Sequence, residues 1–145
     1  MKRRNYRVTF TQKPGFLHAT VTGHNTMETV ERFHQDVLRY CIARNCLRVL
    51  LEERLEGPPL GAMEIFTIVT RGSARVAGKV KAVAYVDARA DRRMLKFAEN
   101  VAVNRGIQAA VFSTVAAAEA WLAQLVSTDV QRLVPVPAQV GKNSG

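Results

Sequence analysis

The chain has 145 residues, of which 48% are hydrophobic and 23% charged, a composition that predicts one soluble globular domain with a single core. No apolar run approaches the ~18 residues needed to cross a bilayer, and the basic start at Met1–Tyr6 is not followed by the apolar stretch of a signal peptide. We therefore expect a cytoplasmic protein without a membrane span.

The net charge of +9 comes from 21 basic and 12 acidic residues, and 15 of the basic residues are arginine. Because arginine favours bidentate contacts with anions, an arginine-rich surface for anions or nucleic acid is one hypothesis. Aromatic side chains that could stack on bases are not interleaved with the basic run Arg71–Lys81. This favours an ordinary solvated surface, and nucleic acid is not the expected partner.

The first part of the chain predicts an antiparallel entry into a sheet. Tyr6–Thr11 and Phe16–Thr22 alternate in strand fashion and are separated by a short turn segment, as in a hairpin. Asn25, with Glu28 three residues later, predicts the N-cap of a helix over 25–44. The apolar stripe of this helix consists of Val30, Phe33, Val37, Leu38 and Cys41.

The middle of the chain predicts a second strand and a second helix. Leu47–Leu51 is a short apolar strand, followed by an acidic loop over 52–56 and by Gly57–Pro59, which cannot continue a strand. A helix is expected over 60–74. Its predicted buried stripe is Ala62, Ile65, Phe66, Val69 and Ser73.

The last third alternates strand, helix, strand and helix. The strands are Val80–Asp87 and Ile107–Phe112, and the helices are Asp91–Gly106 and Thr114–Val126, with an extended tail over 127–145. This order specifies an α/β layer fold. We predict a single-domain mixed sheet of about five strands with four helices, entered through the N-terminal hairpin. The predicted buried residues of the last two helices are Met94, Ala98, Val101, Ala102, Ala118, Trp121, Leu122 and Leu125.

The helix over 91–106 has a clear predicted end. Asn104, Arg105 and Gly106 follow its last apolar residues, and glycine is the usual residue at a left-handed helix stop. Asp91 carries a negative charge at the start of the helix, where the helix dipole favours it.

The order of elements and four segments resemble a known family. The segments are Lys79–Asp87, Phe97–Gly106, Val111–Phe112 and Ala118–Leu122. They are similar to the STAS domains, and more narrowly to the SpoIIAA-like branch that is also described as STAS/SEC14-like. The resemblance covers about 6–126 and implies a small regulatory or binding module, not an enzyme, with an apolar ligand between helix and sheet as one possibility.

In the antagonist members of that family, the resemblance implies a phosphorylated serine at the start of the second helix. Here Gly57–Gly61 occupies that place, and the first hydroxyl after it belongs to Thr67. We therefore expect no phosphoswitch at this position.

In open α/β sheets, ligands gather beyond the carboxyl ends of parallel strands, and several carboxylates lie near those ends. Paired carboxylates can bind magnesium or act in acid/base chemistry. Nearby arginines at 54, 89, 92 and 93 can neutralise them as surface ion pairs, so catalytic residues are not expected. The carboxylates are Glu52, Glu53, Glu56, Asp87 and Asp91.

Histidines and cysteines do not predict a metal site or a cofactor. His18, His24 and His34 are too dispersed for a triad or a ligand set. Cys41 and Cys46 have a Cys-x4-Cys spacing that matches no zinc pattern. Each of these residues is expected to be structural or solvent-facing.

Met63 and Ile68 flank the predicted stripe of the second helix and, with Leu60, could form an apolar patch for self-association or a partner. We expect a non-catalytic module that recognises a protein partner or a small ligand, apolar ligands included. Anion or nucleic-acid binding is the alternative, and an enzyme is the third hypothesis. The candidate binding residues are Glu53, Arg54, Gly57, Pro58, Pro59, Leu60, Gly61, Met63, Ile68, Asp87 and Arg89.

Overall fold

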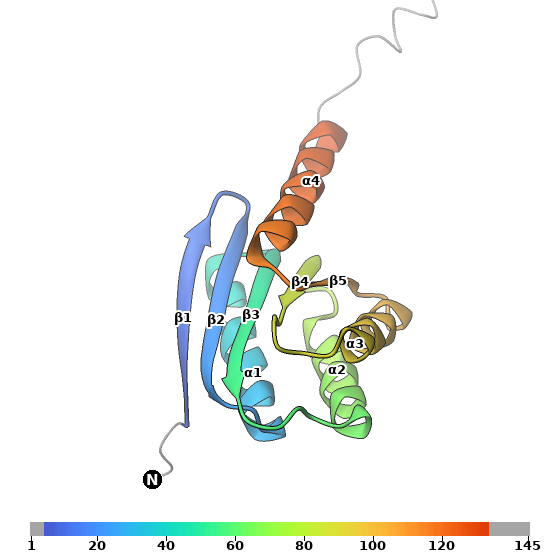
Figure 1. Cartoon of the computed structure of the whole chain (residues 1–145). Coiled ribbons are helices and arrows are strands. Elements are labelled where there is room, and N and C mark those ends of the chain that lie inside the picture. Colours follow the sequence, from blue (N-terminus) through green and yellow to red (C-terminus); the bar gives the residue numbers. More distant parts are fainter. Residues whose placement is uncertain (1–4, 134–145) are drawn as a thin grey trace, which may run out of the picture.

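A computed structural model of the chain describes the backbone of residues 5–133 and the side chains of residues 5–128. It is an α/β fold with one five-stranded mixed sheet and four helices, as predicted (Figure 1). The elements are β1 (Tyr6–Lys13), β2 (Phe16–His24), α1 (Met27–Arg44), β3 (Arg48–Glu56), α2 (Ala62–Val76), β4 (Ala82–Val86), α3 (Arg92–Asn104), β5 (Gln108–Phe112) and α4 (Val115–Leu133).

The strands lie in the sheet in the same order as in the sequence, β1-β2-β3-β4-β5. β1 is antiparallel to β2, and the following strands are parallel to one another. β2 and β3 make the longest parallel pairing, from Leu17 opposite Val49 to His24 opposite Glu56. The predicted hairpin entry is therefore confirmed, and β3 lies at the centre of the sheet.

The helices form two unequal layers. α1, α2 and α3 lie side by side, because α2 packs against both of the others, and together they cover one face of the sheet (Figure 1). α4 lies against β3, β4 and β5 on the other face, and its Val126 reaches the β1–β2 turn at Gly15. None of the helices in the described part of the chain is long and apolar enough to cross a membrane.

Alternation along β3 divides the buried residues into two cores. Val49, Leu51 and Leu55 belong to the core beneath α1 and α2, whereas Leu50 packs with Ala118 and Leu122 of α4. Successive side chains of a strand point to opposite faces. Glu53 therefore points toward the three-helix layer, and Glu52 toward the α4 side.

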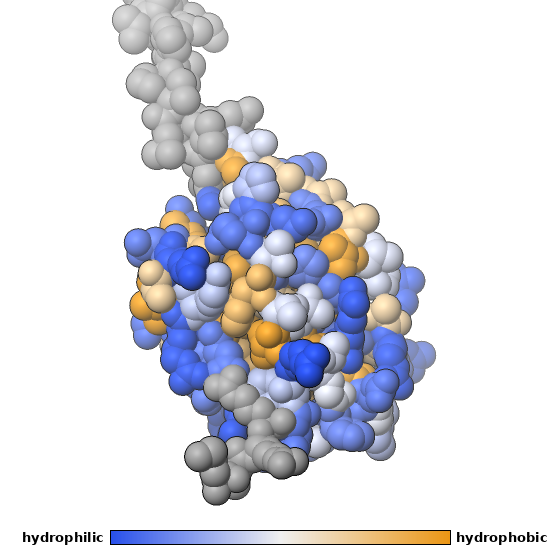
Figure 2. Space-filling model, turned by 90° about the vertical axis from the view of Figure 1, so that its left-hand side faces the viewer, coloured by the Kyte–Doolittle hydropathy of each residue, from blue (hydrophilic) through white to orange (hydrophobic). Residues whose placement is uncertain are grey.

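The sheet edge at β1 is mainly polar. Figure 2 looks onto this side of the molecule, where hydrophilic side chains dominate and apolar ones show in small groups. Along β1 the exposed residues alternate with half-buried ones, and Phe10 of the half-buried set stacks on Tyr40 of α1 with ring centroids 4.2 Å apart. The outward polar row suits an edge strand, since it discourages further strand pairing.

Three predicted element ends are wrong. The acidic segment 52–56 is not a loop, because its pairing with β2 continues to Glu56 and extends β3. The N-cap of α1 is Thr26, whose Oγ1 accepts from the backbone N–H of Thr29 at 3.1 Å. The predicted cap, Asn25, instead donates from its side chain to the Pro58 carbonyl oxygen. α4 continues beyond its expected end to Leu133, and the expected tail over 134–145 lies outside the described residues.

The buried face of α2 also differs from the prediction. Ala62 and Phe66 are exposed, and the guanidinium of Arg105 lies 5.9 Å from the Phe66 ring centroid. Ile68 is 4% exposed and belongs to the core. Ile65, Val69 and Ser73 face the cavity, in agreement with the predicted stripe. Ile68 joins this inward row in place of Phe66, because α2 packs between two other helices.

In α3 and α4, the buried residues agree better with those predicted from the sequence. In α3, Val101 and Ala102 are buried, but the deepest residue of the first turn is Leu95, whereas Met94 is only half-buried. In α4, Ala118 and Leu122 are fully buried, and Trp121 and Leu125 pack partly buried around them.

Gly106 adopts a φ of 83°, as the predicted left-handed helix stop requires. A β-branched side chain is strained in that region, so we expect Gly106→Val to lower the free energy of unfolding by about 1–2 kcal/mol. A Cβ at this position would meet no atom within 4 Å, which means that the loss comes from the backbone alone. Urea unfolding measures it. Gly106→Asn is the control and should lose less, because asparagine tolerates this conformation; equal losses in the two variants would contradict the explanation.

Candidate functional site in a cavity between helices and sheet

A cavity of about 690 Å³ lies between the three-helix layer and strands β3, β4 and β5. Most of the residues around it are aliphatic, contributed by all three helices and by the inward-facing positions of the strands. Its size is within the range of pockets that bind small organic molecules. The main feature of this fold is therefore an unfilled space of this size beside well-packed cores.

One end of the cavity is polar. Glu53 is on β3, Tyr85 and Asp87 are at the end of β4, and His34 comes from α1; all four line the cavity. The pairing of Glu52 with Val86 places Glu53 beside Asp87 at the carboxyl ends of two parallel strands. The sheet topology therefore brings two carboxyl groups, a phenol and an imidazole to one place.

Glu53 is the most deeply buried of these groups, with a side chain only 4% exposed. Burial raises its pKa to about 7; a hydrogen bond from Tyr85 opposes the rise, and the charge of Asp87 adds to it. Its Oε2 atom has no hydrogen-bond partner within the described residues. Glu53 is thus a carboxyl group that titrates near neutrality, with one oxygen free to accept.

His34 lies beside Glu53, with its Nε2 atom 3.9 Å from Glu53 Oε2. That separation is too long for a hydrogen bond, and Nε2 also lacks a partner in the described part of the chain. Burial and, second, the positive charge of Arg75 lower the pKa of His34 to about 4. The imidazole is therefore neutral at neutral pH and forms no ion pair with Glu53.

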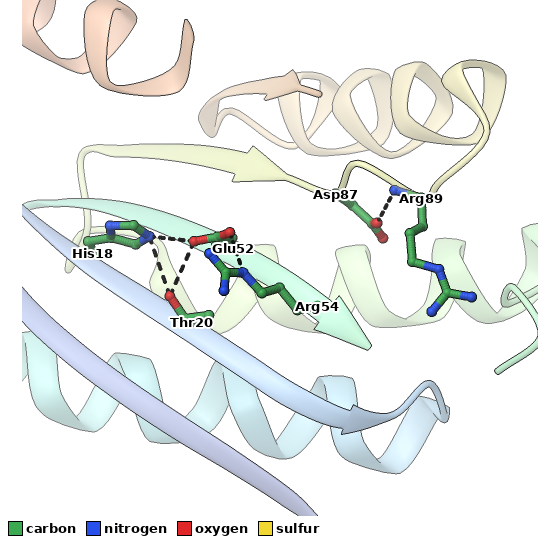
Figure 3. Close-up of polar contacts among 6 residues, drawn as sticks. All are labelled: His18, Thr20, Glu52, Arg54, Asp87 and Arg89. Carbon is green, nitrogen blue, oxygen red and sulfur yellow. Dashed lines mark hydrogen bonds and ion pairs between the residues drawn. The ribbon is translucent and has the colours of Figure 1, made fainter. Parts of the chain in front are cut away.

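Asp87 and Arg89 follow β4 and are held by the loop itself (Figure 3). Asp87 Oδ1 accepts from the backbone N–H of Arg89 at 3.0 Å, and Arg89 Nη1 donates to the Leu55 carbonyl oxygen at 2.8 Å. Burial raises the pKa of Asp87, although backbone hydrogen bonds and the charge of Arg89 oppose the rise. Asp87 therefore has partners that Glu53 lacks.

A second polar cluster lies on the other face of the sheet. In Figure 3, His18, Thr20 and Arg54 converge on Glu52: His18 Nε2 is 2.9 Å from Glu52 Oε1, and Arg54 Nε donates to Oε2 at 2.7 Å. Burial alone would raise the pKa of Glu52, but the hydrogen bonds and charges of Arg54 and His18 outweigh it and lower the pKa. This cluster satisfies its own carboxylate.

The structure brings most of the predicted candidate residues together. Seven of them line the cavity, namely Glu53, Gly57, Pro59, Leu60, Ile68, Asp87 and Arg89. Arg54 belongs to the opposite face, and the carbonyl of Pro58 accepts from Asn25. The backbone N–H of Gly61 donates to Glu64 at the start of α2. Met63 is 76% exposed, whereas Ile68 is buried, so the predicted surface pairing of these two residues is wrong.

The sequence patterns do not identify His34 and Tyr85 as site residues. They predict a structural or solvent-facing role for His34 and only a place in a buried strand for Tyr85. A usable signal existed in β3, where Val49, Leu51, Glu53 and Leu55 form one alternating row with a single acidic member. Recognising that row as one strand would have placed Glu53 inside and directed attention to its neighbours.

The chain matches no family model and no curated protein significantly. Within the described residues, no group of three or more histidine, cysteine, aspartate or glutamate side chains could hold a metal ion.

Glu53 and His34 make opposite contributions to the pH dependence of stability. Folding raises the pKa of Glu53 from 4.5 to about 7, so its stabilising contribution is complete below pH 4.5 and is lost as pH rises through about 7. Folding lowers the pKa of His34 from 6.5 to about 4, so its contribution is present above pH 6.5 and is lost as pH falls through about 4.

The Glu53→Gln variant removes only the contribution of Glu53 to the pH dependence of stability. As pH rises from about 4.5 to 7, we expect the free energy of unfolding of the variant to increase relative to that of the native protein by on the order of 1–3 kcal/mol. Urea unfolding across this pH range measures the difference. Glu56→Gln, at an exposed position of the same strand, should follow the native profile. If all three profiles ran parallel, Glu53 would not have the raised pKa.

Proposed function

We propose that this chain is a non-catalytic cytoplasmic binding module that holds one small, mainly apolar organic molecule in the cavity between its three-helix layer and its sheet. The observation that carries the proposal is the 690 Å³ cavity with the unpartnered Glu53 Oε2 at its polar end. A buried polar atom without a partner is unfavourable, and a ligand that hydrogen-bonds to it removes the cost. The resemblance to the STAS domains, among which binding modules occur, supports the same conclusion.

The buried thiol of Cys41 in α1 and the phenol of Tyr85 in β4 also favour binding over nucleophilic chemistry. Burial raises the pKa of the Cys41 thiol to about 12, so this cysteine is not a thiolate at neutral pH. Burial and the neighbouring Glu53 raise the pKa of Tyr85 well above its ordinary value. Both groups stay protonated under physiological conditions.

The partner and anion hypotheses remain predictions. Met63 is exposed as a partner surface on α2 requires, but Ile68 does not contribute to it. Among the arginines considered for anion binding, Arg71 and Arg75 both contact Glu31, and Arg89 is bound to the Leu55 carbonyl. These contacts use side chains that would otherwise be available to an anion, so small-molecule binding is the function that we put first.

The proposal predicts that the uncharged fluorescent probe N-phenyl-1-naphthylamine binds the native protein with one site per chain. Ala98 of α3 lines the cavity, and Ala98→Phe should weaken probe binding by more than about tenfold because the ring occupies the space. Fluorescence titration measures the affinity. Ala74→Phe is the matched control, since Ala74 is exposed on α2, and it should bind like the native protein.

The same variants test whether the space is empty. Filling a true cavity should change the free energy of unfolding of Ala98→Phe by less than about 1 kcal/mol, whereas overpacking a filled core costs about 1–3 kcal/mol. No probe binding by the native protein, or equal binding by both variants, would contradict the proposed function.

A further inference from the structure

The charge balance around Glu53 is incomplete. Its neighbour in the chain, Glu52, has Arg54 and His18 as partners. Within the described residues, Glu53 forms no ion pair with lysine or arginine, and the charged group that acts on it is another carboxyl, Asp87. Burying a carboxylate without a cation is costly. A ligand that brings a positive charge would supply what the protein leaves out.

The free acceptor atoms are also correctly spaced for one donor. Glu53 Oε2 and His34 Nε2 lie 3.9 Å apart, and both lack partners in the described part of the chain. A single nitrogen can therefore lie about 2.8–3.0 Å from each of them. A neutral imidazole with its proton on Nδ1 offers a lone pair at Nε2, so both atoms can accept from the same group.

We propose that the ligand is an organic amine with an apolar body, and that its ammonium group binds between Glu53 and His34 at the polar end of the cavity. This inference rests on the proposed function. An ammonium group has three N–H donors and no acceptor, which matches a carboxylate, an imidazole lone pair and the oxygen of Tyr85. The aliphatic lining of the remaining cavity receives the apolar body.

Other head groups fit the polar end less well. A carboxylate ligand would face the charges of both Glu53 and Asp87, and like charges at close range repel. A hydroxyl group can donate to Glu53 but leaves its charge uncompensated. The groups that face Glu53 are His34 from α1, Tyr85 from β4 and Asp87 just after β4, with Arg75 of α2 acting on His34. Arg89 also lines the cavity, but its guanidinium donates to the Leu55 carbonyl oxygen and its charge acts on Asp87.

The test compares head groups on the same apolar body. Decylamine, 1-decanol and decanoic acid are each used to displace N-phenyl-1-naphthylamine from the native protein at about pH 8. We expect decylamine to displace the probe at a concentration at least about tenfold lower than either of the others. The preference should shrink at about pH 5.5, where Glu53 is protonated.

Two variants locate the preference. For each variant, the concentration of decanol that displaces the probe is divided by the concentration of decylamine that does so. In Glu53→Gln this ratio should fall to about one. A general change in probe affinity affects both concentrations and cancels in the ratio. In Glu56→Gln, the same chemical change on the opposite side of β3, the ratio should stay as in the native protein. Circular dichroism checks that both variants are folded, and the head-group comparison on the native protein does not depend on either of them.

The outcomes separate this inference from the proposed function. If the probe binds but decanol or decanoic acid displaces it as well as decylamine does, the amine inference is overturned and the cavity remains a binding site. An amine preference that persists in Glu53→Gln overturns it too. If the probe does not bind the native protein at all, both proposals fail together.

Discussion

The burial of Glu53 without a neighbouring cation is the constraint on which the rest of this structure depends. β3 pairs along its length with β2 and over its first half with β4, so its register cannot shift by one residue without turning every side chain to the wrong face. Alternation then places Glu52 on the α4 side of the sheet among its partners, and Glu53 on the side of the three-helix layer. The central strand thus fixes a titratable acid beside a space that the described side chains leave unfilled.

Small side chains explain why that space exists. Where the helix layer approaches the sheet, Gly72 and Ser73 of α2, Ala98 and Ala102 of α3, and Ala109 of β5 line the cavity. Close-packed interiors normally fill such positions with larger aliphatic residues. The cores on the two faces of the sheet follow that rule. Phe33 of α1 and Leu17 of β2 are fully buried on one face, and Leu50 of β3 and Leu122 of α4 are fully buried on the other. The unfilled region is therefore local, and Glu53 lies at its polar end.

The sequence predicted the fold better than the site. Alternation identified the hairpin, and the apolar run at Val80–Asp87 identified a buried strand, because both signals are local. The acidic run 52–56 was misread as a loop, since its strand character depends on pairing with β2 across the sheet. The position of Ile68 was predicted wrongly because α2 packs between two other helices. His34 and Tyr85 become site residues only when α1 and β4 meet Glu53, which no local pattern encodes.

The central claim is that an apolar cavity with Glu53 at its polar end lies between the helix layer and the sheet. A crystal of the protein pressurised with xenon tests this most directly, because apolar cavities take up xenon whereas close-packed cores do not. The account predicts xenon density between α2, α3 and β4, within reach of Ile68 and Val83, and a Glu53 carboxylate that faces it. A structure in which side chains fill that space and no xenon enters would contradict the account.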